Sequence, residues 1–213
     1  MTCNWRDLKK FQNLKECEKP GLPADERFRR WIIEDILQWG QRPYSYVTLF
    51  LLALSTNPKT IVELGTGLGG SATVFTAAAR LTDGKVFTVD KCGPEDDNNA
   101  YTRDLLARDV EDGYLEFIQG DSVDQGKKWD KSPIDFMFFD AQHNHDGVQE
   151  EFEAWHPHTH PRTLMTIHDT MCDGTPTDIY DACEEYAERY KKTCYHLDTH
   201  AGLALIVPWR REN

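Results

Sequence analysis

The sequence lacks any apolar run long enough to cross a membrane. Its longest apolar stretch, residues 46–54, is interrupted by Thr48 and is far shorter than the ~20 residues that a membrane-spanning helix needs. The chain also does not open with the basic and apolar regions of a secretion signal. We therefore expect a cytoplasmic protein that has no membrane partner.

Positive charge is also scarce. Lysine and arginine number 24 against 36 aspartates and glutamates, which gives a formal net charge of -12. The densest basic cluster is only Lys127, Lys128 and Lys131. Such a surface repels polyanions, so we expect no nucleic-acid partner.

Closely spaced cysteine pairs are absent as well. The six cysteines form no C-x-x-C motif. Their even number permits disulfides, but a chain of 213 residues can build a core without such cross-links. We expect free thiols, with disulfides as the alternative.

The hydrophobic pattern is helical at the start of the chain. Apolar residues recur at helical spacing between Phe28 and Trp39, and residues 44–55 form a second helix that is apolar nearly all round. We expect this second helix to be buried. Tyr44, Tyr46, Trp31 and Trp39 are candidates for core packing or for the lining of a substrate pocket.

After Asn57 and Pro58 the pattern changes to short β-like runs alternating with helical segments. The strands are predicted at 60–64, 85–89, 115–119, 134–139 and 164–168, and the helices near 70–81, 98–111 and 146–156. A helix near 177–192 and two strands, 194–198 and 204–207, follow. This order predicts an α/β fold with a doubly wound, mostly parallel seven-stranded Rossmann-like sheet, a C-terminal antiparallel hairpin and helices on both faces. We expect one structural unit, with residues 1–57 as a helical extension of a 58–213 domain.

Glycines and carboxylates follow the predicted strands. Gly65, Gly67 and Gly70 satisfy G-x-G-x-x-G after the first strand, and Gly69 lies within the same loop. The next four strands are followed by Asp90, Asp121, Asp140 and Asp169. Because ligands bind at the carboxyl ends of parallel strands, we expect these groups to surround one site.

The glycine motif by itself fits two cofactors. Asp90 occupies the position of a ribose-binding acid both in an NAD-dependent oxidoreductase and in an enzyme that uses S-adenosylmethionine. An acidic rim disfavours the pyrophosphate of NAD, since one unpaired like-charge contact at 4 Å costs about 4 kcal/mol at an effective dielectric near 20. It attracts the cationic sulfonium and amino groups of S-adenosylmethionine. We therefore favour the methyl donor and keep NAD as the alternative.

Five segments in this order resemble class I S-adenosylmethionine-dependent methyltransferases: residues 62–72, 89–90, 120–122, 138–140 and 167–170. Within the class, Asp140, His143, Trp155, His168 and Asp169 are most similar to the cephalosporin-hydroxylase-like and macrolide-sugar O-methyltransferase branch. One departure is His160-Pro161-Arg162, where the family usually has Pro-Gly-Gly before the fifth strand, so the geometry of that turn is open.

The resemblance implies roles for individual residues. Gly65 and Gly67 would line the methionine part of the cofactor, with Glu63 tuning that loop and Gly69 as a further cofactor-binding residue. Asp90 would bind the ribose hydroxyls. Asp121 would accept a hydrogen bond from the adenine amino group, with Ser122 beside it. The alternative for Asp90 and Asp121 is a structural role as a loop-opening acid or a helix N-cap.

Methyl transfer to a hydroxyl requires loss of its proton, either to a base or with help from a cation. The resemblance implies that Asp140, His168 and Asp169 hold Mg²⁺ or Mn²⁺, and the histidine favours Mn²⁺. Asp140 is also a candidate cofactor-binding residue. His143 is the candidate general base, and Asp140 and Asp169 complete the catalytic group.

The implied function is O-methylation of a small hydroxylated molecule, and the alternatives are the oxidoreductase or a catalytically silent cofactor-binding protein. The loop at residues 171–177 is expected to line the acceptor pocket, but it carries no sequence code that identifies the acceptor. A homo-oligomer could form through residues 46–54 or the edge hairpin. The histidine-rich segment 156–160 is expected to be a solvated loop, with adventitious Zn²⁺ or Ni²⁺ binding as the alternative.

Overall fold

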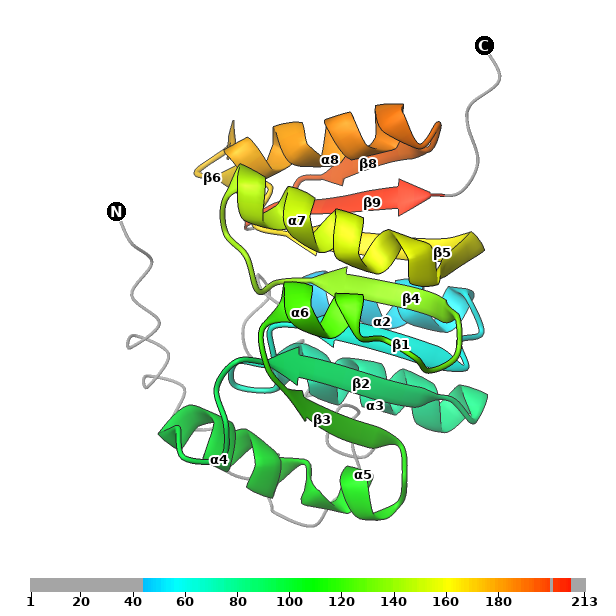
Figure 1. Cartoon of the computed structure of the whole chain (residues 1–213), viewed down its shortest axis with the longest axis vertical. Coiled ribbons are helices and arrows are strands. Elements are labelled where there is room, and N and C mark those ends of the chain that lie inside the picture. Colours follow the sequence, from blue (N-terminus) through cyan, green and yellow to red (C-terminus); the bar gives the residue numbers. More distant parts are fainter. Residues whose placement is uncertain (1–43, 200, 208–213) are drawn as a thin grey trace.

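A seven-stranded sheet with the strand order β3-β2-β1-β4-β5-β9-β8 forms the centre of the molecule (Figure 1). We describe residues 44–199 and 201–207 of a computed structural model. The strands are β1 Thr60–Leu64, β2 Lys85–Asp90, β3 Leu115–Gln119, β4 Ile134–Phe139, β5 Thr159–His168, β8 Thr193–Leu197 and β9 Leu203–Val207. Neighbouring strands among β1 to β5 pair in parallel, while β9 is antiparallel to both β5 and β8. The predicted fold class is confirmed.

Helices cover both faces of this sheet, with α6, α7 and α8 in front of it and α2 and α3 behind it in Figure 1. The helices are α2 Tyr44–Ser55, α3 Gly70–Thr82, α4 Asp97–Leu105, α5 Ala107–Glu111, α6 Ser122–Lys127, α7 His145–Trp155 and α8 Asp178–Arg189. A short 3-10 helix, His156–His158, and a two-stranded ribbon of β6 Met171–Cys172 and β7 Thr175–Pro176 complete the described elements.

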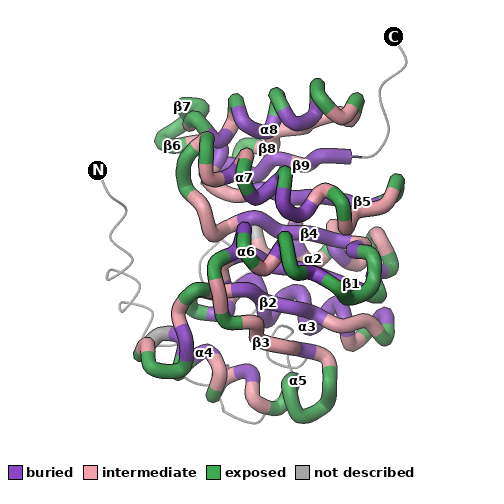
Figure 2. Tube along the Cα trace, in the orientation of Figure 1, coloured by how far each residue is buried: buried purple, intermediate pink, exposed green. Residues whose placement is uncertain are grey.

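The central strands are buried on both faces, as their colour in Figure 2 shows. In β4, Phe136 and Phe138 belong to the core beneath α2 and α3. Met137 and Phe139, which alternate with them, belong to the core beneath α6, α7 and α8. A strand covered on both faces carries a continuous apolar run, because successive side chains point to opposite faces.

Helix α2 is less buried than its composition predicts. It packs against α3, and Leu49 and Ala53 are buried there, but Leu51 is 56% exposed. The expectation of a buried helix therefore holds for only part of the described residues. An apolar helix buries only the side that meets a neighbour.

Two other boundaries differ from the prediction. The segment predicted as one helix near 98–111 is divided at Leu106, whose side chain is buried and whose φ of -100° and ψ of 8° interrupt the helix. Strand β5 begins at Thr159 instead of residue 164. It therefore runs through Pro161, and no turn with a left-handed residue is needed at residues 160–162.

The unusual entry to β5 is held by one hydroxyl group. Thr163 Oγ1 accepts a hydrogen bond from the backbone N–H of His160 at 2.8 Å and donates to the carbonyl of Ile134 at 2.6 Å. These bonds accompany a register shift between β4 and β5 at Ile134 and Phe136. Thr163 thus bridges the irregular pairing of β4 and β5, and the entry to β5 is formed without the Pro-Gly-Gly sequence that is usual in the family.

The predicted helix between Phe28 and Trp39, and with it most of the 1–57 extension, lies outside the described residues. Among the helices that the structure describes, none has the length and apolar character needed to span a bilayer.

Candidate active site

The carboxyl ends of β1 to β5 lie at one edge of the sheet, because these strands are parallel. The chain leaves β1 into the glycine loop, residues 65–70, and leaves the other four strands into segments that contain Asp90, Asp121, Asp140 and Asp169. The structure therefore brings the five predicted segments to the same edge.

Asp90 holds the glycine loop by hydrogen bonds from backbone amides. Its Oδ2 accepts from the N–H of Thr66 at 3.0 Å and of Gly67 at 3.2 Å, and its Oδ1 accepts from Cys92 at 2.8 Å. Each carboxylate oxygen has more than one lone pair and can accept further bonds. Asp90 is thus a loop-holding acid at the position predicted for ribose binding.

Gly65 and Gly67, which follow β1, are glycines for different structural reasons. A Cβ on Gly65 would lie 2.3 Å from the carbonyl oxygen of Asp140, so only glycine allows the two loops to approach this closely. A Cβ on Gly67 would meet nothing within 4 Å, although its φ of +49° favours glycine. Gly67 therefore borders open space where a ligand can approach. Gly69 is the N-cap of α3.

Glu63 lies beneath this loop and is fully buried. Its Oε2 accepts a hydrogen bond of 2.5 Å from Thr88 Oγ1, which in turn lies 2.6 Å from Thr66 Oγ1. Burial raises the pKa of Glu63 to about 8, although hydrogen bonds from Ser71 and Thr88 oppose the rise. Burial therefore favours the neutral form of Glu63, and the edge is less acidic than the sequence predicts.

Asp121 follows β3 and is the N-cap of α6. Its Oδ1 accepts hydrogen bonds from the backbone N–H groups of Val123 at 3.0 Å and Asp124 at 3.1 Å. This is the structural alternative stated above. The side chain is exposed, and its role toward adenine stays a prediction.

Ser122, next to Asp121, contacts a buried carboxyl group that the sequence reasoning missed. Its Oγ donates to Glu151 Oε1 at 2.5 Å. Burial raises the pKa of Glu151 to about 7, although the bond from Ser122 opposes the rise. Glu151 lies on the apolar stripe of α7 with Val148, Phe152 and Trp155. A carboxylic acid within the apolar stripe of a helix can be recognised in the sequence, and it indicates a buried carboxyl group.

At the ends of β4 and β5, carboxylates pair with histidine side chains instead of backbone. His168 Nδ1 lies 3.1 Å from Asp140 Oδ1 and 3.1 Å from Asp169 Oδ1. Burial lowers the pKa of His168, but the hydrogen bonds to both aspartates outweigh this effect and raise it to about 10. His168 therefore bridges the two carboxylates as a cation.

The second histidine of this group is His143, in the loop between β4 and α7. Its Nδ1 lies 3.0 Å from Asp169 Oδ2, and its side chain is 59% exposed. The hydrogen bond to Asp169 raises the pKa of His143 above its usual value. Burial raises the pKa of Asp169, but the bonds from His143 and His168 outweigh it and hold that pKa well below its usual range.

Asp169 has an unusual backbone conformation, with a φ of +58° directly after β5. Aspartate tolerates the left-handed region better than most residues. The carbonyl of Asp169 accepts a hydrogen bond of 2.7 Å from Thr177 Oγ1. This turn presents the carboxylate to both histidines.

The atoms at this edge include one set that fits a metal ion. Ligand atoms of Asp140, His143 and Asp169 lie within 4.8 Å of one another. The set contains His143 in place of the predicted His168. A donor set of two carboxylates and one imidazole suits Mn²⁺ or another transition ion better than Mg²⁺.

The histidine-rich segment after α7 does not converge on a point. His156 Nδ1 contacts the Tyr186 hydroxyl at 2.6 Å, His158 Nε2 the Gly126 carbonyl at 2.8 Å, and His160 Nε2 Asp135 Oδ1 at 2.9 Å. Each imidazole thus has its own structural partner, whereas the sequence predicts a solvated loop.

The predicted acceptor loop contains a turn that the sequence reasoning also missed. Met171 pairs with Pro176 and Cys172 with Thr175. Asp173 and Gly174 connect them with φ angles of +49° and +77°. An Asp-Gly pair is a typical two-residue hairpin connection.

Comparison with known proteins agrees with this architecture. A family model described as a methyltransferase domain matches residues 62–170. The structure of an O-methyltransferase from Bacillus cereus in complex with SAH has 18% identity and a TM-score of 0.62, covering 92% of this chain and 96% of that chain. The O-methyltransferase TomG from Streptomyces achromogenes, involved in tomaymycin synthesis and solved with SAM, has 18% identity and a TM-score of 0.63, covering 92% and 89%.

The SAH-bound methyltransferase PaMTH1 from Podospora anserina covers all of this chain, with 100% and 98% of the two chains aligned, 14% identity and a TM-score of 0.62. Among curated proteins, the uncharacterized protein y4gI of Sinorhizobium fredii is 27% identical over 126 residues, which cover 56% of this chain. The aligned part spans only 14% of the length of y4gI.

The sheet order and these structural similarities define a class I methyltransferase fold. The chain belongs to the methyltransferase-domain family, whose model spans residues 62–170. The predicted class is confirmed, and the alternative of an NAD-dependent oxidoreductase is not retained.

Proposed function

We propose that this protein is an S-adenosylmethionine-dependent O-methyltransferase that acts on a small hydroxylated molecule with assistance from a divalent cation. The observation that carries the proposal is the pairing of His143 with Asp169, beside Asp140, at the edge where the glycine loop lies. It joins a base and carboxylate ligands to a cofactor loop on a methyltransferase fold.

The glycine loop and its acids support the cofactor assignment. Gly67 is exposed and borders open space, and Asp90 lies against its backbone. Asp90 would bind the ribose hydroxyls with its remaining lone pairs, while Asp121 and Ser122 would lie near the adenine. The anionic carboxylates at this edge favour a cationic methyl donor over a pyrophosphate.

His143 is positioned to accept the proton of the acceptor hydroxyl. With Nδ1–H donated to Asp169, its Nε2 keeps a lone pair, and the exposed ring can be reached by a substrate. Asp169 fixes both the orientation of the ring and its tautomer. This arrangement is the usual way in which a carboxylate prepares a histidine base.

Asp140 and Asp169 would be the protein ligands of the cation. Their carboxylates fit a divalent ion, whereas Nδ1 of His168 is engaged by both of them. When bound, a divalent cation lowers the pKa of a coordinated hydroxyl. Nδ1 of His143 cannot both donate to Asp169 and ligate an ion, so we assign His143 the base role.

Calorimetric titration with S-adenosylhomocysteine tests the cofactor assignment. We expect binding to the wild type and a loss of more than about 100-fold in affinity for Asp90→Ala, because two charge-assisted hydrogen bonds contribute about 1.5–3 kcal/mol each. Asp124→Ala, an exposed acid at the start of α6, serves as the control. The melting temperature of each variant shows whether a lower affinity reflects lost contacts with the cofactor or a glycine loop that has lost its structure. Absence of heat in the wild type would contradict the proposal.

Testing the metal and acceptor assignments requires an assay of methyl transfer. Radiolabelled methyl transfer to a panel of hydroxylated small molecules identifies an acceptor. Activity should fall after EDTA treatment and return with Mn²⁺ or Mg²⁺, and Asp169→Ala should lose it. Full activity in both experiments would exclude a catalytic ion. Cofactor binding without transfer to any hydroxyl would favour the catalytically silent alternative.

A further inference from the structure

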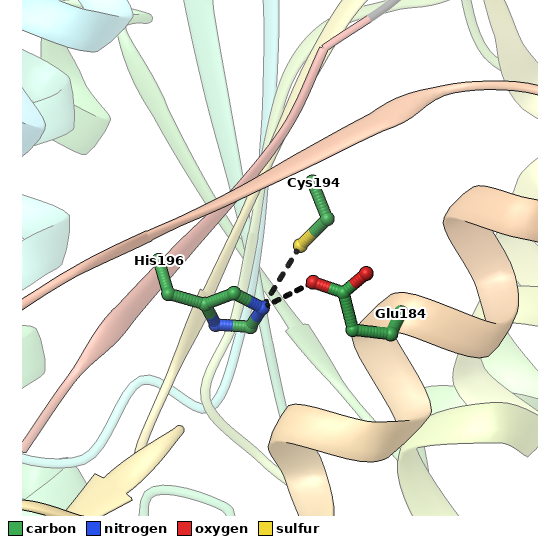
Figure 3. A group of neighbouring side chains, drawn as sticks. All are labelled: Glu184, Cys194 and His196. Carbon is green, nitrogen blue, oxygen red and sulfur yellow. Dashed lines mark hydrogen bonds and ion pairs between the residues drawn. The ribbon is translucent and has the colours of Figure 1, made fainter.

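A second group of metal-binding side chains lies between helix α8 and strand β8, outside the candidate active site. Figure 3 shows Glu184 from α8 and Cys194 and His196 from β8 pointing toward one another. His196 Nε2 lies 3.4 Å from Cys194 Sγ and 2.9 Å from Glu184 Oε1. Cys194 and His196 share a face because they are two residues apart in a strand.

These distances are close to those of a tetrahedral site. Zinc bonds of about 2.3 Å to sulfur and about 2.0–2.1 Å to nitrogen and oxygen place sulfur and nitrogen ligands about 3.6 Å apart, and nitrogen and oxygen about 3.3 Å apart. The ligand atoms of the three residues all lie within 4.8 Å of one another. The three ligand atoms are therefore close enough together to share one ion.

The donor types of this group also indicate zinc. Cys183, which is buried on α8 next to Glu184, is not among the residues whose ligand atoms all lie within 4.8 Å of one another, so the protein supplies three donors. One thiol, one imidazole and one carboxylate form a donor set that selects Zn²⁺ over Mg²⁺ or Ca²⁺, which prefer oxygen. This contrasts with the set at the strand ends, which contains no sulfur.

Neighbouring side chains orient this group, and solvent can reach it. The ring of Tyr180 stacks on His196, with centroids 3.6 Å apart and planes 15° apart, which fixes the imidazole plane. The exposed Glu184 leaves a route for ion entry.

We propose that Glu184, Cys194 and His196 bind one Zn²⁺ ion that ties α8 to the edge strand β8. The three protein donors leave the fourth tetrahedral position to solvent. The bound ion stabilises the sheet edge, where β8 has one hydrogen-bonded neighbour among the described strands.

Cobalt and zinc titration of the full chain tests this proposal, after EDTA treatment and buffer exchange under reducing conditions. One equivalent of Co²⁺ should produce a thiolate-to-cobalt charge-transfer band and intense tetrahedral bands in the visible range. Zn²⁺ should remove them stoichiometrically and raise the melting temperature. Asp140→Asn/Asp169→Asn should retain these signals, which separates this site from the one at the strand ends.

Variants identify the ligands. Cys194→Ser should abolish the charge-transfer band, and Glu184→Gln, an exposed substitution, should weaken Zn²⁺ binding at least about 10-fold. Cys172→Ser changes an exposed thiol outside the group and should bind as the wild type. Circular dichroism without metal verifies that each variant is folded.

Three results would overturn the proposal. The first is the absence of a thiolate band at stoichiometric Co²⁺. The second is a band that Cys194→Ser and Glu184→Gln leave unchanged, which would indicate adventitious binding elsewhere. The third is a Cys183–Cys194 disulfide that forms in air in a protein whose reduced form binds no Zn²⁺.

Discussion

The carboxylates at the ends of β2 and β3 have different partners from those at the ends of β4 and β5. Asp90 and Asp121 accept hydrogen bonds from backbone amides of the glycine loop and of α6. Asp140 and Asp169 pair with imidazoles. A carboxylate bonded to backbone fixes the shape of a loop, whereas one bonded to histidine controls a proton. The two halves of the edge therefore differ in what a substitution should change.

The largest expected effect is on catalysis, at the ends of β4 and β5, where the carboxylates pair with histidines. His143→Ala should lower kcat about 10²–10⁴-fold at neutral pH, because a positioned general base contributes this much. Stability and affinity for S-adenosylhomocysteine should stay near the wild-type values, since the side chain is largely exposed. Steady-state kinetics with an acceptor from the panel measures the effect.

His145→Ala is the matched control, because His145 lies nearby at the start of α7 and pairs with Asp146 and Glu185. It should leave kcat near the wild-type value. Equal rates for His143→Ala and the wild type would remove the distinction between the two halves.

Substitutions in the glycine loop, which Asp90 holds through backbone hydrogen bonds, should mainly change the free energy of unfolding. Gly65→Ala combines a φ of +91° with a Cβ placed 2.3 Å from the Asp140 carbonyl oxygen, so we expect a loss of about 2–5 kcal/mol in the free energy of unfolding. Gly113→Ala has a similar φ of +85° but meets nothing within 4 Å, so it should cost only about 1–2 kcal/mol. Urea denaturation compares the two variants. Equal losses would show that the contact between the loops is not tight.

The smallest effect concerns the buried carboxyl beneath Ser122. Because the pKa of Glu151 rises from 4.5 to about 7 on folding, its protonated form is favoured in the folded state. The corresponding stability, about 3 kcal/mol, is fully present below pH 4.5 and is lost as the pH rises through about 7. Glu151→Gln should lack this decline.

Urea denaturation at a series of pH values measures the decline, with Glu150→Gln as the exposed neighbour. Parallel curves for the wild type and Glu151→Gln would show that Glu151 keeps an ordinary pKa in the folded protein.

Local pattern predicted much of the fold. The predicted starts of β1 to β4, at residues 60, 85, 115 and 134, agree with the structure, and the parallel pairing of these strands follows from their alternation with helices. The start of β5 was predicted too late, because the Thr163 bridge depends on Ile134 in another strand. The burial of α2 was overestimated, because composition does not show which side meets α3.

For the site, the sequence alone determined which residue types reach the sheet edge, because parallel strands carry whatever follows them to the same end. Only the tertiary structure decided the partner of each group: backbone for Asp90 and Asp121, imidazole for Asp140 and Asp169. It also decided that burial raises the pKa of Glu63 and that Cys194 lies near Glu184. The physical reason is that burial and hydrogen bonding depend on contacts between segments far apart in the chain.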